Sequence, residues 1–137
     1  MDDCVFCKIV DEAIPAAKVY EDDKVLCFLT IEAINEGHTL VIPKRHIETV
    51  WDMEDNLYSQ TMDTVKKVSV AIDRAFNPRK VGVMVAGWEI PHAHVHVVPM
   101  NKTGDITSKK LLENTSLKLD LETLTEHAEK IKNNLEI

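Results

Sequence analysis

The sequence has little of what a nucleic-acid or membrane protein requires. Its 137 residues carry 16 Lys and Arg against 23 Asp and Glu, which gives a formal net charge of −7. A nucleic-acid-binding protein needs a basic surface, and this balance argues against one. The sequence also lacks a run of the ~18 to 20 apolar residues that cross a membrane. Neither nucleic acid nor a membrane is therefore expected as a partner.

The N-terminal segment and the few cysteines also lack the marks of an exported protein. The segment MDDCVFCKIVDEA places acids where a signal peptide carries positive charge, and it has no uninterrupted apolar core. We therefore expect a cytoplasmic protein. In a reducing compartment the close pair Cys4 and Cys7 is better suited to metal binding than to a disulfide. Cys27 lies in an apolar segment and is expected to be a core residue.

Apolar patterning predicts an α+β fold with a mostly antiparallel sheet of about five strands, one long helix and a C-terminal helix, the helices packed on one side. A short helix is expected over 4–12, before Pro15. Residues three and four apart predict a long helix from Asp52, as its cap, to Phe76, and a tail helix over 117–135. Short β-branched and apolar segments predict strands at 16–22, 25–30, 38–43, 80–87 and 92–100.

The stretch HAHVHVV, residues 92–98, places three of the chain's six histidines at alternate positions. Because side chains alternate between the faces of a strand, His92, His94 and His96 share one face, and the alanine and valines between them face the core. Neighbouring imidazoles then stand ~6.6 Å apart and the outer two ~13 Å apart. One zinc ion, which binds nitrogen at about 2.0 to 2.1 Å, accommodates two of them more easily than three.

At least one imidazole of this row is therefore left for other chemistry. We favour a site that handles phosphate, in which one histidine attacks and another donates to the anion. A catalytic metal site with three histidine ligands and inert, half-exposed strand histidines are the alternatives.

These residues resemble the histidine triad (HIT) superfamily, whose signature His-φ-His-φ-His-φ-φ, with φ apolar, is matched by HAHVHVV at every position. CVFCKI, PAAKVYEDDKVLCFL, GHTLVIPKRHI and a glycine-containing strand before the triad follow in the family's order. The resemblance covers nearly the whole chain. It implies a homodimer and a single HIT domain over 1–137, with a core over 1–100 and a C-terminal extension over 101–137.

The resemblance also implies a nucleotide hydrolase or nucleotidyl transferase. Such enzymes attack the α-phosphate of a nucleoside phosphate derivative, of the phosphoramidate or dinucleoside polyphosphate type, through a covalent nucleotidyl-histidine. The middle histidine, His94, is then the nucleophile, and its second nitrogen can be held by a backbone carbonyl. His96 contacts the phosphate and, as a cation, would protonate the leaving group. We interpret His38 as a hydrogen-bonding residue at a strand start and His127 as solvated.

Bacterial members of the family that carry a CxxC pair imply a structural zinc site. The ligands implied here are Cys4, Cys7, His46 and His92. Two cysteines and two histidines form a closed tetrahedral set, which is typical of a structural and not of a catalytic zinc ion.

A nucleobase cleft is the last implication of the resemblance, and two departures from the family pattern bear on it. Its apolar positions here are Val5, Phe6, Ile9, Phe28 and Ile31, which would equally serve as core. Thr30 stands where the family usually has an aspartate that accepts hydrogen bonds from the ribose. Trp88 and Glu89 stand where many members have glutamine and then serine or threonine. We therefore expect slow or altered activity on the family's common substrates.

The sequence leaves three functions open. The leading one is an enzyme that acts through His94. The second is a zinc-stabilised nucleotide-binding or interaction module with weak or no catalysis, marked by Thr30, Trp88 and Glu89. The third is a metallohydrolase that uses the triad as metal ligands.

Overall fold

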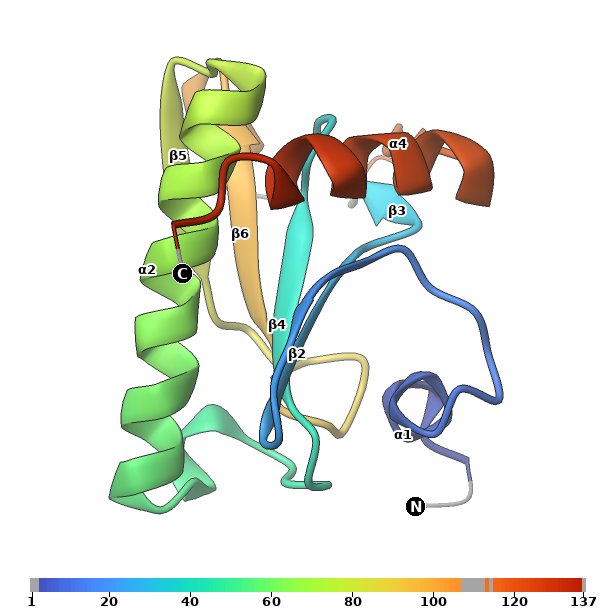
Figure 1. Cartoon of the computed structure of the whole chain (residues 1–137), viewed down its shortest axis with the longest axis vertical. Helices are drawn as coiled ribbons and strands as arrows, with labels where there is room; N and C mark the ends of the chain where they lie inside the picture. The colour runs from blue at the N-terminus through green and yellow to red at the C-terminus, as the bar shows by residue number, and fades with distance from the viewer. Residues whose placement is uncertain (1–2, 107–112, 114, 137) are drawn as a thin grey trace.

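The computed structural model describes residues 3–106, 113 and 115–136, and within them an antiparallel sheet of five strands forms the centre of the fold (Figure 1). The order across this sheet is β1-β2-β4-β6-β5. Its strands are β1 (Lys18–Glu21), β2 (Val25–Leu29), β4 (Thr39–Pro43), β5 (Lys80–Met84) and β6 (Val95–Met100). A separate pair joins β3 (Glu32–Ala33) to β7 (Leu117–Lys118). The helices are α1 (Val5–Val10), α2 (Asp55–Phe76) and α4 (Leu121–Lys132), with 3-10 turns at Val50–Asp52 and Thr103–Asp105.

This architecture confirms the predicted α+β fold, but the helices cover both faces of the sheet. One face, which includes Val41 and Val97, packs with α2 and α4. The opposite face, which includes Phe28 and Leu40, packs with α1 through Phe6. Figure 1 shows α1 and α2 on opposite sides of the sheet. The prediction that all helices lie on one side is wrong, because alternation along the strands gives the sheet two apolar faces.

The long helix begins later than the sequence predicts. The carboxylate of Asp52 accepts a hydrogen bond from Thr49 Oγ1 at 2.8 Å and does not cap α2. The helix begins at Asp55, and Glu54 at its N-cap position makes no side-chain capping bond. It ends at Asn77, which adopts the left-handed conformation (φ 48°) that often terminates a helix.

The C-terminal helix is shorter than predicted. Asp120 accepts a hydrogen bond from the Thr123 amide at 2.8 Å and so caps α4 at its start. The residues before this cap, which include Leu117, form β7 and not the first turn of the helix. No helix in the described part of the chain is long and apolar enough to cross a membrane.

The triad enters the sheet only partway along its length. β5 ends at Met84 and β6 begins at Val95, so His92 and His94 lie in the segment that leads into β6, and the predicted strands over 80–87 and 92–100 are shortened. The Ala93 amide donates to the carbonyl of Ile47 at 2.7 Å and anchors this segment to the chain after β4. The side chains of the triad are thereby held at the face of the sheet that α1 covers.

Candidate active site and metal centre

The four predicted metal ligands lie together at one end of the sheet. Their ligand atoms all lie within 4.8 Å of one another. The Sγ atom of Cys7 is 3.2 Å from Nδ1 of His46 and 3.5 Å from Nδ1 of His92. The Sγ atom of Cys4 is 3.4 Å from the same His92 nitrogen. This cluster could hold a metal ion, and it is assembled from three segments: the start of α1, the chain after β4 and the chain before β6.

The spacing and surroundings of the cluster suit a tetrahedral ion. Zinc–sulfur and zinc–nitrogen bonds of about 2.3 and 2.05 Å place S and N about 3.6 Å apart in a tetrahedron, close to the cysteine–histidine distances here. Burial and the neighbouring Cys4 thiol raise the pKa of Cys7 to about 11. A bound cation would lower this pKa again, because it favours the thiolate. His92 donates from Nε2 to the carbonyl of Pro43 at 2.8 Å, which leaves its Nδ1 lone pair facing the sulfurs.

The next imidazole, His94, is held in one tautomer by the backbone. Its Nδ1 lies 2.8 Å from the carbonyl oxygen of His92. A carbonyl only accepts, so Nδ1 carries the proton and Nε2 keeps a free lone pair. The ring is 7% exposed, and the edge of Phe6 packs against it with 5.2 Å between ring centroids. A neutral imidazole with a free Nε2 is chemically suited to attack phosphorus.

The third imidazole, His96, is held by His38, the residue just before β4. The Ile34 amide donates to Nδ1 of His38 at 3.0 Å, so His38 carries its proton on Nε2. That Nε2 lies 2.9 Å from Nδ1 of His96, which therefore accepts and keeps its own proton on Nε2. The interpretation of His38 as a hydrogen-bonding residue agrees with this geometry, but its partner was not predicted.

Both members of the His38–His96 pair are neutral near pH 7. Burial lowers the pKa of His38 to about 3, and the adjacent His96 acts in the same direction. Burial lowers the pKa of His96 to about 4, with a further contribution from His94. The lowered pKa of His96 disfavours the cation that the sequence interpretation assigns to it, because the ring is desolvated and lies beside His94.

The apolar residues expected to hold a nucleobase do not form one open cleft. Phe6, Ile9 and Phe28 are buried beneath α1, where the two phenyl rings pack with 5.5 Å between centroids. Val5 and Ile31 are exposed, by 36% and 70%. Three of the five positions thus belong to the core, which was the alternative that their apolar character left open.

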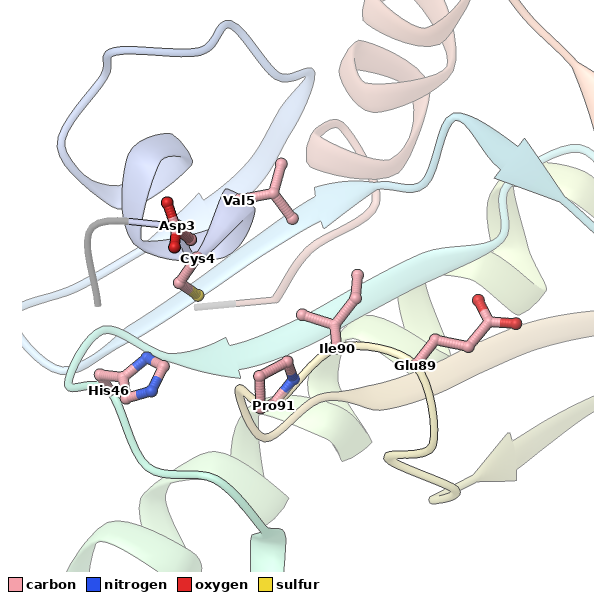
Figure 2. A pocket seen from close by; sticks show the side chains of 7 residues that line it. All are labelled: Asp3, Cys4, Val5, His46, Glu89, Ile90 and Pro91. Atoms are coloured by element: carbon pink, nitrogen blue, oxygen red, sulfur yellow. The ribbon is translucent and has the colours of Figure 1, made fainter.

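A pocket opens at the cysteine–histidine cluster, with Cys4 and His46 in its lining (Figure 2). Glu89 extends away from Cys4 and His46, whereas Val5 and Ile90 provide apolar walls (Figure 2). Ile90 was missed by the sequence analysis, because one isoleucine in a loop carries no periodic signal. The residues that line the pocket are Asp3, Cys4, Val5, His46, Glu89, Ile90 and Pro91.

The two departures from the family pattern lie in different surroundings. Thr30 donates from its amide to the carbonyl of His38 at 3.2 Å, and its Oγ1 accepts from the Glu32 amide at 3.2 Å. Thr30 is therefore a neighbour of the His38–His96 pair. Trp88 lies in the loop between β5 and β6 and is 91% exposed, so its indole makes almost no packing contact with the described residues.

His127 is not solvated, contrary to the prediction. Its ring packs edge-on against Phe76 with 5.3 Å between centroids, and its side chain is 15% exposed. The reason is that α4, which carries His127, packs against α2, so that Phe76 at the end of α2 covers this side chain. Cys27 is fully buried, as predicted.

Comparison with known proteins agrees with the family that the sequence motifs indicate. The HIT domain model matches residues 11–103. The chain is 43% identical over 109 residues to the protein hit of Bacillus subtilis, a match that covers 76% of this chain and 75% of that protein. It is 35% identical over 126 residues to the adenylylsulfatase HINT3 of Arabidopsis thaliana, a match that covers 88% of this chain and 64% of that protein. It is 36% identical over 97 residues to the adenosine 5′-monophosphoramidase hnt1 of Schizosaccharomyces pombe, a match that covers 70% of this chain and 73% of that protein.

Solved structures share the fold over almost the entire chain. A HIT-like protein involved in cell-cycle regulation from Bartonella henselae superposes with a TM-score of 0.82 at 28% identity, covering 98% of each chain. A zinc-bound histidine triad family protein from Mycobacterium smegmatis superposes with a TM-score of 0.78 at 27% identity, covering 97% of this chain and 93% of that one. With its triad, its fold and its relatives in agreement, the chain belongs to the HIT family.

Proposed function

We propose that this protein is a nucleotide hydrolase or nucleotidyl transferase that attacks the α-phosphate of a nucleoside phosphate derivative through His94. The observation that carries the proposal is the 2.8 Å hydrogen bond from His94 Nδ1 to the carbonyl of His92, which leaves Nε2 free as a nucleophile. Relatives named an adenylylsulfatase and an adenosine 5′-monophosphoramidase support an adenosine 5′-phosphate derivative as the substrate.

The proposed reaction has two steps at one phosphorus atom. In the first, the His94 Nε2 lone pair forms a bond to the α-phosphorus, and the leaving group takes the electron pair of the bond that breaks. In the second, the oxygen of water or of another hydroxyl acceptor forms a bond to the same phosphorus, and the P–N bond breaks with its electron pair returning to Nε2. The proton of the acceptor passes to solvent, and the nucleotide is released. The carbonyl of His92 stabilises the positive charge that develops on the ring, and the Nε2–H group of His96 donates to a phosphate oxygen.

We further propose that Cys4, Cys7, His46 and His92 hold a structural zinc ion. A bound zinc ion supplies stability there, since four protein ligands leave no position for substrate. The zinc-bound relative from Mycobacterium smegmatis supports this choice of metal. These ligands join α1 to the segment that presents the His92 carbonyl, so the proposed zinc site and the nucleophile share one backbone support.

The metallohydrolase alternative fits the triad poorly. The Nδ1 atom of His92 faces sulfur atoms, that of His94 faces a carbonyl, and that of His96 faces His38. Three imidazoles with three different partners do not converge on a single ion. Chelators would inactivate such an enzyme directly, whereas the proposed enzyme loses stability.

A homodimer, a cytoplasmic location and a single domain over 1–137 remain predictions. The dimer is supported by β5, which is the outermost strand beside β6 in the described sheet, and by the exposed side chains of Val83 and Val85 at its end. Sedimentation equilibrium at several protein concentrations tests it, and a concentration-independent monomer mass would contradict it.

Intact-protein mass spectrometry tests the main proposal. Wild type and His94→Ala are mixed briefly with adenylyl sulfate or adenosine 5′-phosphoramidate and quenched without acid, with His127→Ala as a matched control. We expect a mass gain of one adenylyl group in wild type and in His127→Ala only, with release of AMP. If folded, zinc-loaded protein gives neither adduct nor turnover, the nucleotide-binding module replaces the enzyme.

A further inference from the structure

We propose that Cys4 and Cys7 are also a site of reversible oxidation, at which hydrogen peroxide converts the pair to a disulfide and the bound metal is released. The proposal rests on the proposed zinc site and is separate from the reaction at His94. Oxidation removes the link that the metal makes between α1 and the segment leading into β6, and reduction by a dithiol restores it.

The two sulfur atoms are well placed to bond to each other. Cys4 is the N-cap of α1, and its Sγ atom accepts a hydrogen bond from the Cys7 amide at 3.4 Å. Both sulfurs lie beside the Nδ1 atom of His92, at 3.4 and 3.5 Å, and within 4.8 Å of each other. Residues three apart in a helical turn have Cα atoms about 5 Å apart, inside the range of about 4.4 to 6.8 Å that a disulfide spans. A disulfide therefore fits this turn with little movement of the backbone.

An oxidant can reach this pair but not the third cysteine of the chain. Cys4 lines the pocket that opens at the cluster (Figure 2), and Cys7 is half-buried. Cys27 is fully buried and packs on the opposite face of the sheet from Cys4. Oxidation is thereby confined to Cys4 and Cys7.

The oxidation proceeds in two steps and consumes one molecule of hydrogen peroxide. In the first, the Cys4 sulfur forms a bond to one peroxide oxygen, the O–O bond breaks, and the other oxygen leaves with the electron pair and takes up a proton. In the second, the Cys7 sulfur attacks this sulfenic acid, the S–S bond forms, and the S–O bond breaks to release hydroxide, which also takes up a proton. Each sulfur loses one electron, and each peroxide oxygen gains one.

The disulfide removes two of the four metal ligands. Its sulfurs no longer carry the negative charge of thiolates, so His46 and His92 alone remain, and a structural zinc site requires four ligands. Only apolar packing, through Phe6 and Ile9, then holds α1 on the sheet. The edge of Phe6 lies against the ring of His94 with 5.2 Å between ring centroids. Loosening of α1 is therefore felt at the candidate nucleophile.

Treatment of the reduced, zinc-loaded protein with hydrogen peroxide tests the proposal. Intact mass, zinc release to a coloured chelator and trypsin cleavage after Lys8, an exposed residue of α1, are followed together. We expect a mass loss of about 2 Da, as one disulfide requires, with release of the bound zinc and severalfold faster cleavage after Lys8. Cleavage after Lys24, in the turn between β1 and β2, should not change. A dithiol and added zinc should restore the mass, the bound metal and the slow cleavage.

Two variants identify the sulfurs that react. Cys27→Ala should respond as the wild type does, because its side chain takes no part. Cys7→Ser has no second sulfur near Cys4, so it should gain oxygen, about 16 Da or more, in place of the 2 Da loss. Retention of zinc, oxygen addition without a disulfide in the wild type, or an unchanged rate of cleavage after Lys8 would overturn the proposal.

The outcomes also show which proposal has failed. Reduced protein that binds no zinc refutes the zinc site and, with it, the release of metal on oxidation. Zinc-loaded protein that keeps its metal under peroxide refutes only the oxidation site. Absence of an adenylyl adduct on His94 refutes the proposed reaction, and the mass, zinc and cleavage measurements still decide the oxidation.

Discussion

The backbone of His92 holds the ring of His94: the Nδ1–H group of His94 donates to the His92 carbonyl at 2.8 Å. The side chain of the same His92 lies 3.4 Å from the Sγ atom of Cys4 and 3.5 Å from that of Cys7. One residue thus belongs to the candidate metal centre through its ring and to the candidate active site through its main chain.

If the cluster holds the proposed zinc ion, losing a ligand should affect both stability and the His94 ring. We expect Cys7→Ser to bind less than one zinc ion per chain and to lose about 3 kcal/mol of unfolding free energy, the upper end of the usual range for single substitutions. We also expect the ¹⁵N shifts of His94 to move, because the His92 carbonyl is no longer fixed. Elemental analysis, urea unfolding and NMR check these outcomes. Cys27→Ala is the matched control, and a similar zinc loss there would contradict the assignment.

Acid should destabilise the fold through His38 and His96. The folded pKa values, about 3 and about 4, lie below the unfolded value near 6.5, so the unfolded state binds more protons below pH ~6.5. Stability is then fully present above that pH and is lost as pH falls toward 4 and 3, by up to about 1.4 kcal/mol per pH unit for each histidine.

Urea unfolding between pH 4.5 and 7.5 measures this slope. The Cys4→Ser/Cys7→Ser variant provides the background, because acid also releases metal from thiolates. Adding His38→Asn should reduce the slope, since one titrating group is removed. An unchanged slope would show that other groups control the loss of stability at acid pH.

A methyl group at Gly37 should disturb the support of His38. Gly37 has a φ of 92°, and a Cβ atom there would lie 2.8 Å from the ring of Phe76. We expect Gly37→Ala to cost about 2 to 3 kcal/mol, which combines backbone strain with the clash. Gly87→Ala is the control, because Gly87 also has a positive φ, of 66°, but a Cβ atom added there would meet no atom within 4 Å. We expect this variant to lose only about 1 kcal/mol of unfolding free energy. Equal losses in the two variants would exclude the clash.

Trp88 should affect ligand binding but not the stability of the fold. Because the indole is 91% exposed, Trp88→Ala should change the unfolding free energy by less than about 0.5 kcal/mol. If Trp88 contacts the nucleotide, its fluorescence in a Trp51→Phe background should change on AMP binding, and Trp88→Ala should weaken that binding. No fluorescence change and unaltered affinity would remove Trp88 from the binding surface.

The sequence predicts the elements of this fold well but not their long-range pairing. Strand segments and the buried stripe of α2 follow from side-chain periodicity. Periodicity does not say which face of the sheet a short helix covers, so the position of α1 was missed. It also gives no signal for a two-residue strand such as Leu117–Lys118, whose pairing with Glu32–Ala33 depends on tertiary contacts.

The candidate site, too, could be predicted from the sequence only in part. Residue type and spacing were enough to select the four clustered cysteines and histidines. The protonation of His96 was not predictable, since it depends on His38, 58 positions away, and on one main-chain amide at Ile34. A histidine at the start of a strand was the available signal, but it names no partner.

The separation of Cys4 and His92 by 88 positions has a consequence for the order of folding. Cys4 and Cys7 emerge early during synthesis, but their cluster cannot be completed until His92 has left the ribosome. Joining such distant residues closes a very long loop, whose entropic cost grows only slowly with length. A metal ion bound by this cluster would therefore join the two ends of that loop only after most of the chain has been synthesised.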